Sequence, residues 1–356
     1  MTTVHNAALS QTHYANDRLR PVRIWLYAMA AMVLLMVVVG GITRLTESGL
    51  SITSWKPISG TIPPLNDAQW EAEFEAYKQI PQFQVNNSWM SVDDFKVIFF
   101  WEFVHRLLGR LLGVAFLVPF LVFLYQKRFT PQLAWPLFGL FILGGFQGAL
   151  GWWMVSSGLS ELTSVSQYRL AAHLTAASLL FIALVYLPRA LEPGRVTGFE
   201  PTRNMAWAVV LLMLLILQIG AGAFVAGLDA GMGYNTWPLM DGALVPDGLG
   251  AMQPAWRNLF ENALTVQFIH RTLAYLIVVY VGVTLWQQRA AGFAGLHGWL
   301  PRIGLLVLLQ VVLGIATLVM QVPTSLAVGH QALAFMLAGV TIAYIADMRR
   351  AARSNP

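Results

Sequence analysis

Four histidines lie within long apolar stretches of the chain, where a polar side chain is costly and usually faces the interior of a helix bundle. They are His105, His173, His270 and His330. The chain has no cysteine, which removes thiolate metal sites, disulfides and thiol catalysis. Two imidazoles that face each other across a helix bundle can ligate a haem iron from both sides. The histidines therefore predict two bis-histidine haem sites, with helix–helix hydrogen bonds or a zinc or copper ion as the alternatives.

Glu102 distinguishes the first of these histidines from its counterpart in the second half of the chain. It lies three residues before His105, on the same face of a helix, whereas Gln267 holds the equivalent place before His270. An ionisable carboxyl at one site and an amide at the other indicate different roles. Proton-coupled chemistry suits the first site, and electron transfer or a structural haem suits the second. The plainer alternative is that Glu102 only hydrogen-bonds a neighbour or is hydrated near the membrane surface.

Two arginines and several small residues complete the candidate sites. Arg106 and Arg271 directly follow two of the histidines and are placed to pair with haem propionates, or to anchor the helices at the membrane interface. Small residues on the same helix face, which make room for a macrocycle, are Gly109, Gly113, Ala177, Ala274 and Ala334.

The elements that must position these residues are membrane helices. Hydrophobic residues make up 57% of the 356 residues and charged residues 11%, and the mean hydropathy is +0.60. An ordinary soluble protein has about 25% charged residues, so this composition excludes a soluble enzyme, a disordered chain and a nucleic-acid-binding domain. A membrane helix needs about 20 mostly apolar residues. Eight such runs occur, approximately at 23–42, 96–124, 133–155, 170–191, 204–226, 262–286, 300–320 and 325–347.

Lysine and arginine positions predict the orientation of the chain. If the N-terminus is inside, 13 of the 22 basic residues fall in inner segments and 5 in outer ones. The positive-inside rule then places both termini in the cytoplasm and the two long links, 43–95 and 227–261, outside. Residues 66–78 of the first link predict a surface helix, with Asn66 or Asp67 as its cap. No cleavable signal peptide is expected in the polar N-terminal tail, residues 1–22.

The chain also contains an internal repeat. The first four spans match the last four in order and direction, which predicts a parallel repeat built from two pseudo-symmetric four-helix bundles. The first bundle covers 23–191 and the second 204–347, with a cytoplasmic linker at 192–203 and a tail at 348–356. The matching segments are Arg44–Trp55 with Ala226–Trp237, Glu102–Arg106 with Gln267–Arg271, Gln147–Gly151 with Gln310–Gly314, and the regions beginning at His173 and His330.

These features together resemble the haem A synthase family, over residues from about 22 to 347. The resemblance is carried by the eight spans in two halves, by Glu102-x-x-His105-Arg106, His173, His270-Arg271 and His330, and by the stretch Gly40–Ser51. Some members of that family have cysteine pairs in the outer loops. Because this chain has none, it resembles the cysteine-free members from alphaproteobacteria and mitochondria.

The resemblance implies a reaction and a set of roles. In that family haem O, which carries a farnesyl tail, is oxidised at one ring methyl to a formyl by successive hydroxylations, giving haem A for cytochrome oxidase. By resemblance, His105 and His173 bind the haem that is oxidised, His270 and His330 bind haem b, and Glu102 is the catalytic carboxylate. The implied location is the bacterial inner (cell) membrane.

The expected partners follow from the same resemblance and leave several points open. Haem O is the substrate, and the haem O synthase and cytochrome oxidase assembly factors are expected neighbours in the pathway. The electron donor or acceptor, and whether the chain forms a homo-oligomer, stay open. No nucleic-acid partner is expected.

Two other functions compete with this interpretation. A di-haem b-type membrane cytochrome that passes electrons from quinol would share the histidines and the fold, but it would leave Glu102 without a role. A transporter with parallel repeats would place its polar groups near the bilayer midplane. Here they cluster near the outer ends of the spans, which argues against a transporter.

Overall fold

In the computed structural model the described residues, 2–160, 162–193, 201–290 and 298–354, are almost entirely helical, and within these ranges there is no β-strand. Eight helices are long and apolar enough to cross a membrane. This confirms the predicted all-α membrane class and the eight spans. They are α1 (Thr2–Leu45), α3 (Val92–Tyr125), α4 (Pro131–Ser156), α5 (Gln167–Ala190), α6 (Pro201–Gly227), α8 (Ala263–Ala290), α9 (Trp299–Val319) and α10 (Thr324–Ser354).

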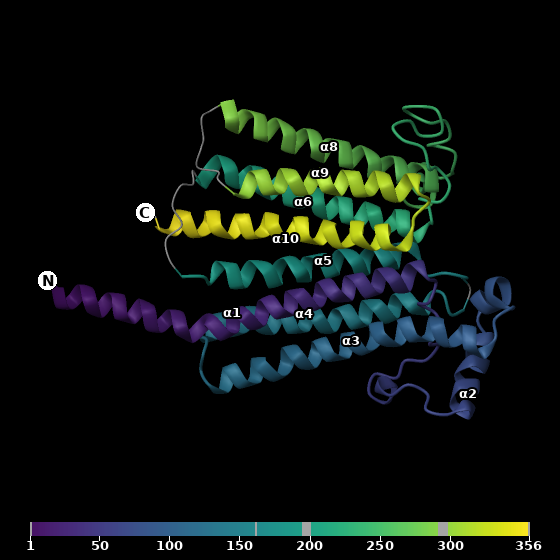
Figure 1. Cartoon of the computed structure of the whole chain (residues 1–356), viewed down its shortest axis with the longest axis horizontal. Helices are drawn as coiled ribbons and strands as arrows, with labels where there is room; N and C mark the ends of the chain where they lie inside the picture. The colour runs from purple at the N-terminus through teal and green to yellow at the C-terminus, as the bar shows by residue number, and fades with distance from the viewer. Residues whose placement is uncertain (1, 161, 194–200, 291–297, 355–356) are drawn as a thin grey trace.

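The two ends of the chain lie at one end of the helices, and the two long connections lie at the other (Figure 1). We call the connections the first outer segment (residues 46–91) and the second outer segment (residues 228–262). The polar tail expected at 1–22 is helical from Thr2 and continuous with the first span, with Pro21 inside the helix. The greater part of the predicted linker 192–203, residues 194–200, lies outside the described residues, as do the last two residues of the tail 348–356.

Helix α3 begins earlier than the apolar run predicts. Ser91 caps it by accepting a hydrogen bond from the backbone N–H of Asp94, while the Asp94 carboxyl accepts one from the backbone N–H of Ser91. The helix has 34 residues. At 1.5 Å per residue it is about 50 Å long, against a hydrocarbon core of about 30 Å. Its first turns therefore extend past the membrane core and support the first outer segment.

The first outer segment folds onto that extension. Its main helix is α2 (Asp67–Lys78), capped by Asn66, which confirms the predicted surface helix. Short turns of helix at Ser59–Thr61 and Phe83–Asn87 complete the segment. Apolar side chains from α2, from the flanking chain and from α3 form one buried cluster, which includes Leu50, Phe74, Tyr77, Phe95 and Phe99. The second outer segment has only Ala255–Arg257 and α7 (Asn258–Glu261) as helical turns.

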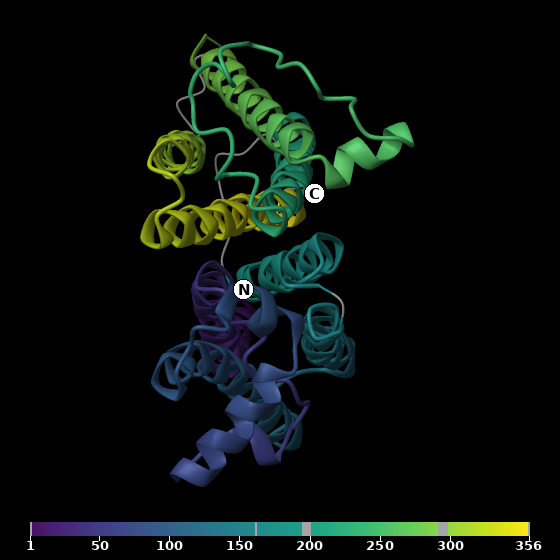
Figure 2. The same cartoon turned by 90° about the vertical axis from the view of Figure 1, so that its right-hand side faces the viewer.

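The eight long helices pack as two groups of four (Figure 2). In the first group α1 and α4 each contact both α3 and α5, and in the second α6 and α9 each contact both α8 and α10. The same neighbours therefore meet in each half, and the pseudo-symmetric relation between the halves stays a prediction. Between the halves, α5 contacts α6 and α10, and α1 contacts α10.

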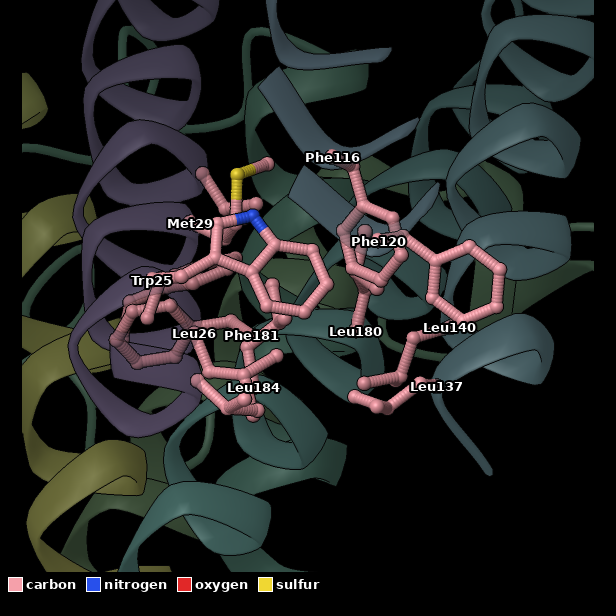
Figure 3. Close-up of a cluster of buried hydrophobic side chains, with 14 of the residues drawn as sticks. Trp25, Leu26, Met29, Phe116, Phe120, Leu137, Leu140, Leu180, Phe181 and Leu184 are labelled. Carbon is pink, nitrogen blue, oxygen red and sulfur yellow. The ribbon is translucent and has the colours of Figure 1, made fainter. Parts of the chain in front are cut away.

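The inner half of the first bundle is filled with apolar side chains (Figure 3). All four helices contribute to this cluster, which closes the bundle on the side of the chain termini. A second cluster fills the corresponding part of the other bundle. Because apolar side chains fill the inner half of each bundle, the polar candidate residues lie in the outer halves. The labelled side chains of the first cluster are Trp25, Leu26, Met29, Phe116, Phe120, Leu137, Leu140, Leu180, Phe181 and Leu184.

Ion pairs join the two halves at both ends. At the inner end Arg189 of α5 donates two hydrogen bonds of 2.8 Å to the buried carboxylate of Asp347 on α10. At the outer end Arg44 of α1 donates to the carboxylate of Asp229 at 3.0 Å and to the carbonyl of Ala226 at 2.8 Å. These contacts set the relative position of the two bundles.

Candidate functional site

The four candidate histidines lie in the outer halves of four different helices. His105 and His173 project from α3 and α5 of the first bundle, and His270 and His330 from α8 and α10 of the second. Three of them are about two turns from the outer end of their helix. His105 is deeper along α3 because the first turns of that helix extend into the outer segment. The rings of His270 and His330 contact each other, and the pairing of His105 with His173 stays a prediction.

Each histidine ring lies against a glycine of a neighbouring helix. A Cβ atom placed on any of these glycines would come 2.8–3.3 Å from an atom of the imidazole. Any larger residue would displace the ring, so the glycines let helix backbone and imidazole meet. The contacts are Gly40 with His105, Gly151 with His173, Gly222 with His270, and Gly314 with His330.

The glycines occupy equivalent positions in the internal repeat. Gly151 and Gly314 lie in the matching segments found in the sequence. Gly40 and Gly222 were missed as site residues, although the register that aligns Arg44 with Ala226 also aligns them. The sequence signal was therefore present, but only the packing showed what these glycines contact.

The second histidine pair has a separation suited to one metal ion. The ring centres of His270 and His330 are 6.4 Å apart, with the ring planes at 75°. A metal–imidazole bond is about 2 Å long, so two imidazoles on opposite sides of one metal ion have centres about 6.3 Å apart. In the described part of the chain no three histidine, aspartate or glutamate side chains gather as a metal site. Two axial imidazoles suit a haem, whose porphyrin supplies the other four ligands.

Glutamines adjoin these rings, and several of their polar atoms are unpaired. The Gln218 amide nitrogen lies 3.1 Å from Nδ1 of His270 and donates to the carbonyl of His270 at 3.0 Å. That of Gln310 donates to the carbonyl of His330 at 3.0 Å. Among the described residues no hydrogen-bond partner is found for the buried Nδ1 atoms of His173 and His330, the amide oxygens of Gln218 and Gln310, or both amide atoms of Gln147. Such unpaired buried atoms fit a site completed by a bound polar molecule.

Glu102 is buried and fully engaged. Its side chain is 3% exposed. One carboxylate oxygen accepts hydrogen bonds from the Ser51 hydroxyl at 2.7 Å and from the Ile52 backbone N–H at 2.8 Å. The other accepts two from Arg106, at 2.6 and 3.0 Å. Glu102 therefore joins α3 to the first outer segment, and its carboxylate is held in place one turn from His105.

Arg106 completes this anchor. Its guanidinium also donates to the carbonyls of Ile52 at 2.7 Å and Ser54 at 2.9 Å. The haem-propionate role predicted for this arginine is not tested by these contacts. They show that it fastens the first outer segment over the histidine end of the bundle.

The second bundle has the same arginine contacts, but the side chain beside its arginine is a neutral glutamine. Arg271 donates to the carbonyls of Tyr234 at 2.8 Å and Thr236 at 2.9 Å, which are the repeat counterparts of Ile52 and Ser54. It also donates to the Gln267 side-chain oxygen at 3.2 Å. Gln267 in turn donates to the carbonyls of Ala230 and Tyr234. The arginine contacts to the outer-segment carbonyls are thus common to both halves, whereas only the first half has a carboxylate beside the arginine.

Fold and site together define a class: an eight-span membrane protein with two histidines in the outer half of each bundle and outer segments anchored by arginine. The comparisons with known proteins agree. Residues 23–342 match the family model COX15-CtaA, described as a cytochrome oxidase assembly protein. The chain belongs to this family.

Relatives of this chain carry the name Heme A synthase. The one from Azorhizobium caulinodans is 54% identical over 94% of this chain and 95% of its own length. Those from Allorhizobium ampelinum and Parvibaculum lavamentivorans are 49% and 50% identical, over 92% and 90% of this chain and 90% and 92% of their own lengths. The resemblance drawn from the sequence is confirmed.

Proposed function

We propose that this chain is a haem A synthase that oxidises one ring methyl of haem O to a formyl group. The names of its relatives and the family match over nearly the whole chain support this activity. The observation that carries the proposal is the pair of matching histidine sites, only one of which has a carboxylate beside it. If two haems are bound and only one of them is oxidised, the two sites must differ, and the carboxylate is such a difference.

The reaction belongs to the first bundle in this proposal. His105 and His173 hold the haem that is oxidised, and His270 and His330 hold haem b. The haems supply the redox chemistry, while the chain binds and orients them. Gly40 and Gly151 fix the distance between the helix backbones and the first pair of imidazoles. The anchored outer segments cover the histidine ends and exclude water there.

Glu102 contributes charge from a fixed position. Both of its carboxylate oxygens already accept hydrogen bonds from Ser51, Ile52 and Arg106. This arrangement favours stabilisation of positive charge that develops as the methyl is oxidised, over free exchange of a proton. Gln267 has no charge to offer at the corresponding place, which suits a haem that only passes electrons.

The location proposed for the chain is the bacterial inner membrane with both termini in the cytoplasm. Eight apolar helices support the multi-pass form. The excess of lysine and arginine in the segments on the side of the termini supports the orientation. The histidine pairs then lie nearer the outer surface.

The test is haem extraction with chromatographic identification, on protein purified from cells that make haem O. We expect haem B together with haem O or haem A from the wild-type protein. Glu102→Gln should retain both haems and keep the fold, because Gln267 already fills this role beside Arg271. Its conversion of haem O to haem A should fall at least about 100-fold, the size of a typical loss of one positioned catalytic group.

The matched control is Asp93→Asn, which neutralises an exposed carboxylate on the same helix as Glu102 and should leave the conversion in place. Haem B alone in the wild-type protein, unchanged when haem O is supplied, would favour an electron-transfer cytochrome instead. Normal haem A yield from Glu102→Gln would remove Glu102 from the mechanism and leave it as an anchor of the outer segment.

A further inference from the structure

A buried amide in the first bundle has no hydrogen-bond partner among the described residues. Gln147 lies on α4, four residues before Gly151, whose Cβ position is 3.3 Å from the His173 ring. Residues four apart share a helix face, so Gln147 faces the same bundle interior, one turn further from the outer end. Both of its amide atoms are buried and unpaired. Leaving such groups unsatisfied is costly, which points to a polar ligand group at this place.

The matching residue of the second bundle has a partner within the chain. Gln310 occupies the same place before Gly314, and its amide nitrogen donates to the carbonyl of His330 at 3.0 Å. Gln147 has no such bond to His173. The amide oxygen is unpaired in both bundles, but the amide nitrogen is free only in the first, where it can donate to a group that the second bundle does not have to bind.

The first bundle also has more space beside this amide. Gly144 lies one turn before Gln147, and a Cβ atom placed on it would meet no atom within 4 Å. Its counterpart in the repeat is Val307, which is buried at 5% exposure in the second bundle's apolar cluster. The same place on the helix thus holds open space in one half and a packed valine in the other.

Haem O and haem B differ by one substituent that matches these two differences. Haem O carries an isoprenoid tail joined to the ring through a carbon that bears a hydroxyl, where haem B has a vinyl group. The propionates are charged and belong at the outer, hydrated end. The opposite edge of the ring then faces the apolar inner half, where the tail hydroxyl is the polar group that needs a partner.

We propose that Gln147 and the space at Gly144 form the subsite that recognises the hydroxyl and the first part of the isoprenoid tail. This inference rests on the proposed function. It makes Gln147 a specificity-determining residue, which selects haem O over haem B in the first bundle. It also places the first part of the tail against α4 at Gly144.

The experiment measures selection rather than turnover. Full-length protein from cells that do not make haem O is incubated with equal haem O and haem B, and the haems retained after washing are identified by chromatography. Wild-type protein should retain one haem O and one haem B. Gln147→Met should lower the preference for haem O about tenfold, as for loss of one hydrogen bond to a buried group. Gly144→Val, which copies the second bundle, should lower it at least as far.

The matched control is Gln126→Met, which changes an exposed glutamine just beyond the inner end of α3 and should leave the preference for haem O unchanged. Retention of haem B at the second site shows in each case that the variant has folded. Unchanged preference in Gln147→Met would overturn the role of the amide, and unchanged preference in Gly144→Val would overturn the placement of the tail at Gly144. If the variants keep the wild-type preference while the wild type converts haem O, the inference fails alone. If the wild type does not retain haem O, the proposed function fails.

Discussion

At the scale of single residues, the site depends on contacts between glycine and histidine. Four imidazoles each lie against a glycine of a neighbouring helix, at distances where a methyl group would contact the ring more closely than side chains normally do. Glycine is unfavourable within a helix, costing about 1 kcal/mol relative to alanine. Here that cost is offset by close approach of helix and ring, which brings two imidazoles to the separation of a shared metal ion.

Alanine substitutions at these glycines should therefore disable one haem site at a time. In Gly314→Ala the new methyl would lie 2.8 Å from Cε1 of His330, and the ring must move. We expect the second bundle to lose at least half of its haem b, while the first bundle keeps its haem. Absorption spectra of the purified protein, with haem extraction, measure both. In contrast, Gly145→Ala should be silent, because a Cβ there meets no atom within 4 Å; equal loss in both variants would contradict this account.

At the scale of elements, an arginine on each of two long helices holds an outer segment over a histidine pair. Arg106 and Arg271 make the same two carbonyl contacts in their own halves. The two arginines differ in their side-chain partner. Arg106 pairs with the buried carboxylate of Glu102, and Arg271 with the amide of Gln267. The common part is structural, and the added charge in the first bundle is the feature that we propose the reaction uses.

The two arginine variants should thus differ in stability. Arg106→Ala leaves the Glu102 carboxylate buried without its cationic partner, a change that typically costs about 3–5 kcal/mol. Arg271→Ala leaves a neutral amide, for about 1–3 kcal/mol. Thermal unfolding in detergent shows which of the two variants loses more stability. Limited proteolysis should show faster cleavage within residues 51–54 for the first variant and within 234–236 for the second. A larger cost for Arg271→Ala would mean that the charge of Glu102 is not held by Arg106.

At the scale of the whole molecule, the two bundles are joined by ion pairs at both ends and by apolar packing between them. Asp347 at the inner end is buried, with its carboxylate 4% exposed, and accepts from Arg189 and Arg350. Asp229 at the outer end is 61% exposed. Burial decides which of the two contacts matters for stability, because an exposed pair is screened by water and salt.

Neutralising these two aspartates should accordingly have unequal effects. Asp347→Asn should lower the free energy of unfolding by about 2–4 kcal/mol, since two partly buried arginines lose the nearly buried one of their carboxylate partners and keep Glu192. Asp229→Asn should change it by at most about 1 kcal/mol. Thermal unfolding of the purified protein, followed by loss of haem absorbance, compares them directly. Equal shifts in the two variants would show that the inner contact is no stronger than a surface pair.

Much of the site was predictable because the repeat multiplies weak signals. A single histidine in an apolar span has many explanations, but four at matching places indicate two pairs. The same comparison separated Glu102 from Gln267. It was less informative for Arg106 and Arg271, whose bonds to loop carbonyls depend on how the outer segments fold back. Gln147 was noticed as part of a repeated motif, but the absence of any partner for its amide is a property of packing.

The sequence by itself determined the membrane class and the eight spans, and it predicted the two-part organisation and the histidines proposed as ligands. These follow from hydropathy, from helix period and from internal similarity, all of which are local or one-dimensional properties. Only the tertiary structure decided which glycine meets which imidazole, where the carboxylate of Glu102 is anchored, and where the first bundle keeps open space. The physical reason is that these contacts join helices far apart in the chain, and their distances depend on packing, not on spacing along the sequence.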